Sequence, residues 1–329
     1  MTTKFRWGIL STANIGRVAM VPALKASNQA NVIGVASRNK ASAEQFAAEF
    51  KIEQVYGNYQ ALLDNPKIDI VYIPLPNHLH KEWTLKAAEA GKHILCEKPL
   101  ALDPDECLEM INAAQDNGVK LMESFMYRHH PRIISAVDLV HSDKIGEIKV
   151  IETGFTFRLK NLNDIRYQPE MGGGALMDVG CYCINISRLI AGREPRSVMA
   201  KAVWAETGVD EQLTGILDFG DGLTTHFDCG FNMTSRQRCL IAGTEGYLEI
   251  PNCFLPGKNK SLITEVRGPD KIKTYKFNEV DQYRLIAEDF MQSITSDQTR
   301  YKIKDAVDNM RVIKALINSA KNGGIPVEV

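Results

Sequence analysis

Short apolar runs alternate with amphipathic segments along residues 1–125 of this chain. Near-continuous apolar runs predict buried strands, and the segments between them have the spacing of helices. Strands separated by helices and buried on both faces are typical of a parallel sheet covered on both sides. The predicted strands span 5–10, 32–36, 55–56, 68–73, 93–96 and 120–123, and the predicted helices span 15–27, 41–50, 59–64, 80–90 and 104–117. This half therefore predicts an α/β, doubly wound nucleotide-binding domain.

Strands dominate the predicted structure of residues 126–329. Apolar and polar side chains alternate along 223–232, which predicts an antiparallel sheet with one buried face. Glycine-containing turns at 220–222 and 243–246 separate neighbouring strands, as hairpins require. The predicted strands span 148–158, 197–204, 211–219, 223–232, 238–242 and 247–251, and the helices span 131–141, 181–190, 282–294 and 305–319. We therefore expect one domain at 1–125 and a second at 126–329, with the last helix able to pack back on the first domain.

The composition excludes several classes of function. A length of 329 residues exceeds what one core usually holds, and a net charge of -1 offers no broad basic surface to nucleic acid or membranes. No apolar stretch approaches the roughly 20 residues that span a bilayer. The first predicted strand begins at residue 5, which leaves no room for a signal peptide. The seven cysteines lack metal-ligand spacing, so we expect buried, reduced thiols in a cytoplasmic protein without a metal.

The loop after the first strand has the position of a dinucleotide-binding loop. Laid on the fingerprint G-x-G-x-x-G, its glycine positions fall at Ser11, Ala13 and Gly16. Serine and alanine do not readily take positive φ, so we expect a variant turn. The candidate pyrophosphate-binding residues are Ser11, Thr12, Ala13, Asn14, Ile15 and Gly16. The alternative is an ordinary turn between a strand and a helix.

The end of the second strand indicates which dinucleotide would bind. NAD enzymes place a carboxylate here for the ribose 2′-hydroxyl, but this chain has Ser37 and Arg38, and no carboxylate before Glu44. A hydroxyl and a guanidinium suit a 2′-phosphate. We therefore expect NADP rather than NAD, the alternative being a solvated basic turn.

Two further loops follow predicted parallel strands and should border the same ligand. After the fourth strand come Pro74, Leu75, Asn77 and His80, where Asn77 is a plausible helix cap and His80 a packing residue. After the fifth come Glu97, Lys98 and Pro99. Proline holds Lys98 on a stiff peptide, from which its ammonium could face cofactor and substrate together. The alternative for Lys98 is an ordinary solvated lysine.

A glycine-rich segment stands out in the second half. Three consecutive glycines at 172–174 allow the backbone to approach a ligand or another chain closely. Asp178 and Tyr182 follow, four residues apart, so on a helix they share one face. In a purely structural alternative, Asp178 caps a core helix in which Tyr182 is buried, but this alternative leaves the three glycines unexplained.

Taken together, these motifs resemble the Gfo/Idh/MocA family of oxidoreductases over essentially the whole chain. The resemblance implies an N-terminal Rossmann domain and a C-terminal α+β domain with a large, open, mostly antiparallel sheet. Within the family, the chain is similar to the branch of dihydrodiol dehydrogenases, NADP-dependent xylose dehydrogenases and sugar-ketone reductases, which has tyrosine at the position of Tyr182. Inositol-dehydrogenase-type members have histidine there and aspartate where Asn185 stands. That departure argues against their mechanism here.

The resemblance also implies partners and pocket residues. The open sheet of family members commonly forms a subunit interface, so we expect a homodimer or homotetramer. Glu123 and Arg128 would help to build the cofactor and substrate pocket, with Phe125 and Met126 as an apolar wall. Phe157, Arg158 and Arg166 would close the substrate side, although solvated or structural roles are equally open for these three.

The chemistry requires hydride transfer at carbon and proton transfer at the substrate oxygen. Tyr182 is our candidate for the proton, and lowering a tyrosine pKa from about 10 to about 7 requires about 4 kcal/mol. One cation about 4 Å away supplies about 4 kcal/mol at an effective dielectric of about 20, so we expect Lys98 and Tyr182 to converge. Asp178 would orient substrate hydroxyls or that pair. Lys98 as direct proton donor remains an alternative.

The sequence thus predicts an NADP-dependent oxidoreductase that acts on a hydroxyl or carbonyl carbon of a sugar, sugar derivative or cyclic diol. Two alternatives stay open. One is a dinucleotide-sensing regulator of the same fold without catalysis. The other is a sugar–sugar oxidoreductase with a permanently bound cofactor.

Overall fold

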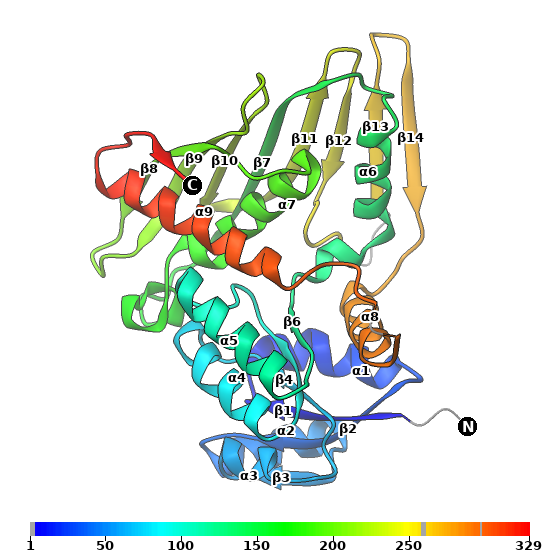
Figure 1. Cartoon of the computed structure of the whole chain (residues 1–329), viewed down its shortest axis with the longest axis vertical. Helices are drawn as coiled ribbons and strands as arrows, with labels where there is room; N and C mark the ends of the chain where they lie inside the picture. The colour runs from blue at the N-terminus through cyan, green and yellow to red at the C-terminus, as the bar shows by residue number, and fades with distance from the viewer. Residues whose placement is uncertain (1–3, 258–260, 297) are drawn as a thin grey trace. The chain divides into compact units, whose positions relative to one another are not determined.

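The computed structural model describes residues 4–257, 261–296 and 298–329 (Figure 1). The described residues form two compact units. The first unit contains the described part of Met1–Met126 and of Asp281–Val307, and the second contains that of Tyr127–Val280 together with Asp308–Val329. Helix α8 (Gln282–Ser296) therefore belongs to the first unit, whereas the sequence analysis assigns it to the second domain. Phe290 of this helix packs edge-on against Trp7, with ring centroids 6.2 Å apart.

The first unit is built on a parallel sheet of six strands in the order β3-β2-β1-β4-β5-β6. This order is that of a doubly wound Rossmann sheet, and it confirms the expected fold class. The order reverses between β1 and β4, where such sheets bind their ligands at the carboxyl ends of the strands. The strands are β1 (Phe5–Leu10), β2 (Ala30–Ala36), β3 (Gln54–Tyr56), β4 (Ile70–Ile73), β5 (His93–Cys96) and β6 (Leu121–Glu123).

Helices connect these strands, and local sequence explains where several of them begin. Asn39, Asn58 and Asp103 cap α2, α3 and α5, because each side chain accepts a hydrogen bond from a main-chain N–H of the first turn. The first helical stretch contains a π-helical turn, Gly16–Met20, before it continues as α1. The α-helices of the first unit besides α8 are α1 (Val21–Ala26), α2 (Lys40–Phe50), α3 (Tyr59–Leu63), α4 (His80–Glu89) and α5 (Pro104–Asp116).

The second unit is built on a nine-stranded sheet in the order β14-β13-β12-β11-β7-β10-β9-β8-β15. Its neighbouring strands run antiparallel except for the parallel pair β7 and β10. This confirms the expected mixed, mostly antiparallel sheet. The strands are β7 (Ile148–Arg158), β8 (Ser197–Trp204), β9 (Asp210–Asp218), β10 (Thr224–Gly230), β11 (Asn232–Gly243), β12 (Tyr247–Pro251), β13 (Ser261–Val266), β14 (Ile272–Phe277) and β15 (Val327–Glu328).

The two faces of this sheet differ in polarity. Helices α6 (Pro131–His141), α7 (Cys181–Ala191) and α9 (Lys304–Lys321) lie along one face (Figure 1). Residues that point toward α7, such as Phe155, Phe227 and Cys239, are buried. The alternate positions carry charged side chains, including the ion pairs Arg238–Glu152 and Arg236–Asp228. The period-two pattern of the sequence therefore corresponds to one apolar and one polar face.

Three strands were not predicted: β13, β14 and β15. In β14, two lysines and a threonine make up half of the six residues, and β15 has two residues, so neither carries a strong apolar signal. All seven cysteines are buried, as expected. Among the described residues, no helix is long and apolar enough to cross a membrane.

Candidate active site

Four loops of the first unit lie at one edge of its sheet, because they follow the carboxyl ends of the parallel strands β1, β4, β5 and β6. Hydrogen bonds connect neighbouring loops at this edge. The Ser11 hydroxyl donates to the Pro74 carbonyl at 3.2 Å, and the Ser124 N–H donates to the Cys96 carbonyl at 2.8 Å. The structure thus brings the candidate residues of the first three loops, Ser11–Gly16, Pro74–His80 and Glu97–Pro99, to a single edge.

Ser11 has a φ of 131°, so the expectation that a serine here would avoid positive φ is wrong. Its hydroxyl, besides donating to Pro74, accepts the Ala13 N–H at 3.2 Å, and these bonds offset the strain of the turn. Gly16 lies buried in the first turn of the helical stretch that begins at Asn14. A Cβ at Gly16 would lie 3.9 Å or more from Tyr72, Phe46 and Pro74. The fold itself therefore does not require this glycine.

After β2, the two candidate residues have different surroundings. Ser37 is buried, and its hydroxyl accepts the Asn39 N–H at 3.2 Å, so it stabilises its own turn. Arg38 is exposed. Its guanidinium lies near the Tyr59 phenol, where burial raises the pKa of Tyr59 and Arg38 opposes that rise. Of the two candidate residues, Arg38 is therefore the one that this turn presents to solvent.

His80 is fully buried and connects two of the loops. Its Nδ1 lies 3.0 Å from the Pro99 carbonyl, and its Nε2 lies 2.8 Å from the Leu75 carbonyl. Burial lowers the pKa of His80 to about 4, so the ring is neutral near pH 7. This is the packing role expected for His80. Asn77, however, lies within a 3-10 turn and α4 is preceded by Leu79, so the expectation that Asn77 caps that helix is wrong.

Glu97 points into the protein. Its Oε1 accepts the Tyr72 hydroxyl at 2.6 Å, and burial raises the pKa of Glu97 while the Tyr72 bond opposes the rise. Glu123 Oε1 accepts the Leu100 N–H at 2.8 Å. Both carboxylates thus hold the turn that carries Lys98, whose peptide bond to Pro99 is cis. The sequence analysis assigned these two glutamates to the cofactor pocket, and the bonds described here give them a positioning role.

A buried turn follows β6, where the chain passes from the first unit into the second. Arg128 lies in the 3-10 turn Met126–His129 and is 8% exposed. Phe125 and Met126, the expected apolar wall, are 1% and 2% exposed. Phe157 packs on Phe231 with ring centroids 5.1 Å apart, whereas Arg158 is exposed.

Asp178 and Tyr182 lie on one helical stretch. A π-helical turn, Leu176–Gly180, runs directly into α7, and Ala175 is the residue that precedes it. Asp178 is therefore inside the helix, so the alternative in which it caps the helix is wrong. Its carboxylate instead accepts Arg166 Nε at 2.7 Å, and this negative charge raises the pKa of Arg166.

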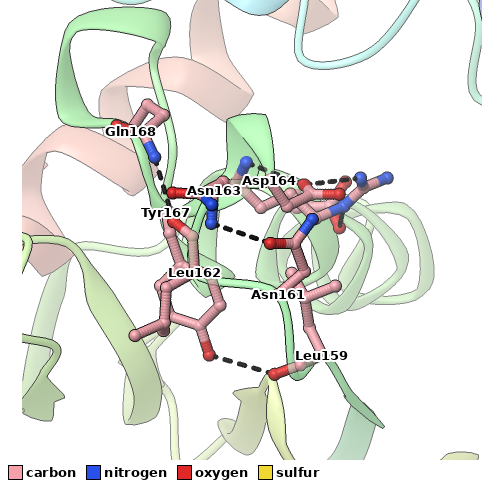
Figure 2. A network of polar contacts seen from close by, with 9 residues as sticks. Leu159, Asn161, Leu162, Asn163, Asp164, Tyr167 and Gln168 are labelled. Atoms are coloured by element: carbon pink, nitrogen blue, oxygen red, sulfur yellow. Dashed lines mark hydrogen bonds and ion pairs between the residues drawn. The ribbon is translucent and has the colours of Figure 1, made fainter.

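The loop that presents Arg166 is folded onto itself, as Figure 2 shows. Gln168 donates to the Leu162 carbonyl at 3.0 Å, and the Asn163 N–H donates to the Asn161 side chain at 3.0 Å. Asp164 accepts both the main-chain N–H of Arg166, at 3.0 Å, and its guanidinium, at 3.2 Å. The Arg166 guanidinium thus donates through one terminal nitrogen to Asp164 and through Nε to Asp178.

Tyr182 is 6% exposed and is surrounded by aromatic rings. The centroids of Tyr127, Phe155 and Phe254 lie 5.7, 5.5 and 5.3 Å from its own. The Tyr127 hydroxyl donates to Asn185 Oδ1 at 2.6 Å, which holds the Tyr127 ring in place. Sequence reasoning missed this aromatic cluster. Tyr127 could have been found beside Arg128, but no local signal marks Phe254.

Comparisons with known proteins match both halves of the chain to one family. Residues 5–125 match the family profile described as "Oxidoreductase family, NAD-binding Rossmann fold", and residues 133–249 match the "GFO/IDH/MocA C-terminal domain". The chain is 36% identical to a D-xylose 1-dehydrogenase (NADP(+)) of Haloferax volcanii, over 96% of this chain and 98% of that one. It is 34% identical to a trans-1,2-dihydrobenzene-1,2-diol dehydrogenase of Xenopus tropicalis, over 77% of this chain and 76% of the other.

Solved structures include a close structural relative. A 3-ketoreductase from Actinomadura kijaniata, in complex with NADP and TDP-benzene, has a TM-score of 0.91 and 31% identity, and the match covers 96% of this chain and 98% of that chain. The relatives named here are dehydrogenases and reductases, and both halves of the chain match domains of one family. The chain belongs to the Gfo/Idh/MocA family of NAD(P)-dependent, sugar-related oxidoreductases.

Proposed function

We propose that the protein is an NADP-dependent oxidoreductase that transfers hydride between the nicotinamide and a hydroxyl or carbonyl carbon of a sugar, sugar derivative or cyclic diol. The observation that carries the proposal is the pairing of Asp178 and Tyr182 on one helical stretch. Tyr182 is enclosed by aromatic rings and Asp178 is fixed by Arg166. A fixed phenol and a fixed carboxylate suit proton transfer to, and orientation of, a polyhydroxylated substrate.

NADP is the proposed cofactor. The carboxyl-edge loops of the first sheet offer the helix start at the exposed Asn14 for a pyrophosphate and the exposed Arg38 for a 2′-phosphate. When bound, the cofactor would supply or accept the hydride. The Haloferax xylose dehydrogenase is named for NADP, and the Actinomadura ketoreductase was solved with it, which supports NADP over NAD for this chain.

Each candidate catalytic residue has a proposed role. Tyr182 transfers the proton to or from the substrate oxygen, Lys98 stabilises the ionised phenol, and Asp178 orients substrate hydroxyls. Structures of the Actinomadura ketoreductase include one variant with a tyrosine changed to phenylalanine and others with a lysine changed to alanine or glutamate. That lysine and that tyrosine are spaced along their chain as Lys98 and Tyr182 are here, which supports this assignment.

The test is Tyr182→Phe, measured with NADP(H) and a panel of sugars, ketoses and diols. We expect turnover to fall by about 100-fold or more, the usual contribution of acid–base catalysis, while the Kd for NADPH changes less than about twofold. Tyr247→Phe is the matched control, because Tyr247 is exposed on strand β12. Unchanged turnover in Tyr182→Phe would remove this residue from the mechanism.

The same panel separates the alternatives. Tight NADPH binding by the unmodified protein with no turnover of any compound would favour a dinucleotide sensor. Absorbance of a nicotinamide that stays with the freshly purified protein would favour a sugar–sugar oxidoreductase with permanently bound cofactor.

We also propose that the polar face of the second sheet joins copies of the chain into a homodimer or homotetramer. Exposed Ile216 on β9 is in register with His226 and Glu152, and Val203 and Trp204 are exposed on β8, so apolar and charged side chains mix here as they do in subunit interfaces. Light scattering of Ile216→Lys should report smaller assemblies, and Ile325→Lys, an exposed residue outside the strands, is the control. A cytoplasmic location stays a prediction.

A further inference from the structure

The start of the helical stretch that carries Asp178 and Tyr182 has no cap from its own residues. Neither Ala175, before the π-helical turn, nor Gly180, before α7, makes a side-chain capping bond. The first N–H groups of a helix need acceptors when they are buried. Leu176 is fully buried, so its N–H requires a partner from elsewhere in the fold.

Asp210, the first residue of β9, supplies that acceptor. Its Oδ2 accepts the Leu176 N–H at 2.7 Å, and the side chain is 4% exposed. A buried carboxylate is costly unless its oxygens are hydrogen-bonded. Asp210 belongs to the rigid sheet, and Leu176 lies two residues before Asp178. The bond therefore connects the candidate catalytic helix to the sheet.

The glycines before this helix are explained by the same contact. Gly174 has a φ of 117°, and a Cβ there would collide with the Asp210 carboxylate. A Cβ on Gly173 would lie 2.5 Å from the Arg166 carbonyl. Glycines at both positions therefore let the chain pass between Asp210 and the loop of Arg166. The notable glycine run serves close packing of this segment within its own unit.

Main-chain bonds complete the segment. The Gly174 N–H donates to the Arg166 carbonyl at 2.9 Å, and the Asp178 N–H donates to the Gly174 carbonyl at 3.0 Å. Arg166 then reaches forward to Asp178 with its side chain. Asp210 fixes the start of the helix on one side, and the Arg166 loop fixes it on the other. A displacement at Asp210 would consequently move Asp178 and Tyr182 together.

We infer that Asp210 is a positioning residue for the reaction, which sets the place of Asp178 and Tyr182 through its bond to the Leu176 N–H. This inference rests on the proposed function for its kinetic consequence. Its structural consequence, an ordered helix start, is independent of any turnover. Reacting groups displaced by about 1 Å can lose on the order of 100-fold in rate.

The test compares Asp210→Leu with Asp210→Asn. Leucine has a similar shape without an acceptor, whereas asparagine keeps a carbonyl oxygen for the Leu176 N–H. Asp218→Ala, at the exposed far end of the same strand, is the matched control. The measurements are kcat and KM with NADPH and the best substrate of the panel, the Kd for NADPH, and amide hydrogen exchange of residues 175–185.

We expect Asp210→Leu to lower kcat by about 10- to 100-fold with little change in the Kd for NADPH, and to raise exchange across 175–180. Asp210→Asn should keep most of the wild-type kcat and most of the wild-type protection from exchange across 175–180. If the unmodified protein turns nothing over, the proposed function fails, and the exchange difference alone decides the role of Asp210. Three outcomes would overturn the inference: wild-type kcat and exchange in the leucine variant, equal losses in both variants, or a leucine variant that no longer folds or binds NADPH.

Discussion

The Arg166 guanidinium donates through Nε to Asp178 Oδ2 at 2.7 Å, while its other side is held by Asp164. A carboxylate held by a guanidinium in this way is fixed in orientation. Arg166 was expected to close the substrate side, and the bond gives it a second role, that of orienting Asp178. The side chain of Asp178 is 16% exposed, so an incoming hydroxyl still has access to it.

Arg166→Gln should therefore impair turnover more than folding. We expect kcat/KM to fall by about 10- to 100-fold, because Asp178 loses a charged partner worth about 1.5–3 kcal/mol, while the melting temperature changes by a few degrees at most. Steady-state kinetics and thermal melting measure the two effects. Arg196→Gln is the control, since Arg196 pairs with Asp221 on an exposed surface. Equal kinetics in Arg166→Gln and wild type would show that Asp178 does not depend on Arg166.

The turn at Ser11 combines an unfavourable φ with a helpful hydroxyl. Ser11→Gly removes the strain and loses the bonds, so we expect a melting temperature within a few degrees of wild type. Ser11→Ala keeps the strain and loses the bonds to Pro74 and Ala13, so it should be less stable than Ser11→Gly and bind NADPH more weakly. Thermal melting measures the stability of both variants, and NADPH titration measures their affinity for the cofactor. A more stable alanine variant would contradict the role of the hydroxyl.

Arg38 should govern the choice between the two dinucleotides. Arg38→Asp replaces a guanidinium that suits a 2′-phosphate with a carboxylate that suits a ribose 2′-hydroxyl. We expect the preference for NADPH over NADH to fall by about 10- to 100-fold, since bonds to charged groups are worth about 1.5–3 kcal/mol. Fluorescence titration with both dinucleotides measures the ratio. Lys67→Asp changes an exposed cation before β4, away from the carboxyl-end loops, and should leave the ratio unchanged.

Asp210 should also make stability depend on pH. Burial raises the pKa of Asp210 to about 7, and the main-chain N–H groups of Leu176 and Ala175 oppose that rise. The folded protein then binds one more proton than the unfolded chain between about pH 4 and about pH 7, so stability falls as pH rises through this window. Among the described residues, the thiol of Cys229 faces Asp210, and burial keeps its pKa high enough for it to stay neutral there.

Asp210→Asn removes this titration while keeping the acceptor. The melting temperature of the asparagine variant, relative to wild type, should therefore be higher at about pH 8 than at about pH 5. A difference of several degrees between the two pH values is expected, because about two pH units separate pH 5 from the pKa of Asp210, which corresponds to about 3 kcal/mol. Parallel melting curves at both pH values would mean that Asp210 ionises as an ordinary exposed carboxylate does.

Most of the first unit could be predicted from local patterns. The inner strands of its sheet are short apolar runs, such as Ile70–Ile73 and His93–Cys96, because a parallel strand inside the sheet is buried on both faces. The position of Lys98 followed from that strand and from Pro99. The conformation of Ser11 could not be predicted, because the bond that stabilises its φ comes from Pro74, in a loop 63 residues away.

In the second unit, the period of two predicted a sheet with one buried face and the spacing of Asp178 and Tyr182 predicted a shared helical stretch. The sequence could not show what holds them. Arg166 lies 12 residues from Asp178, and Asp210 lies 34 residues from Leu176. These contacts depend on how the sheet and the glycine segment pack together. Nothing in the sequence next to Arg166 or Asp210 indicates that they make them.

The sequence by itself determined the family, the doubly wound sheet and the residue types of the chemistry, because these follow from periodicities and motifs that neighbouring residues create. Only the tertiary structure decided which groups bind one another. Tyr72 binds Glu97, Arg166 binds Asp178, and Asp210 binds the Leu176 N–H. The physical reason is that burial and hydrogen-bond partners are properties of the folded packing, which joins residues that are distant along the chain.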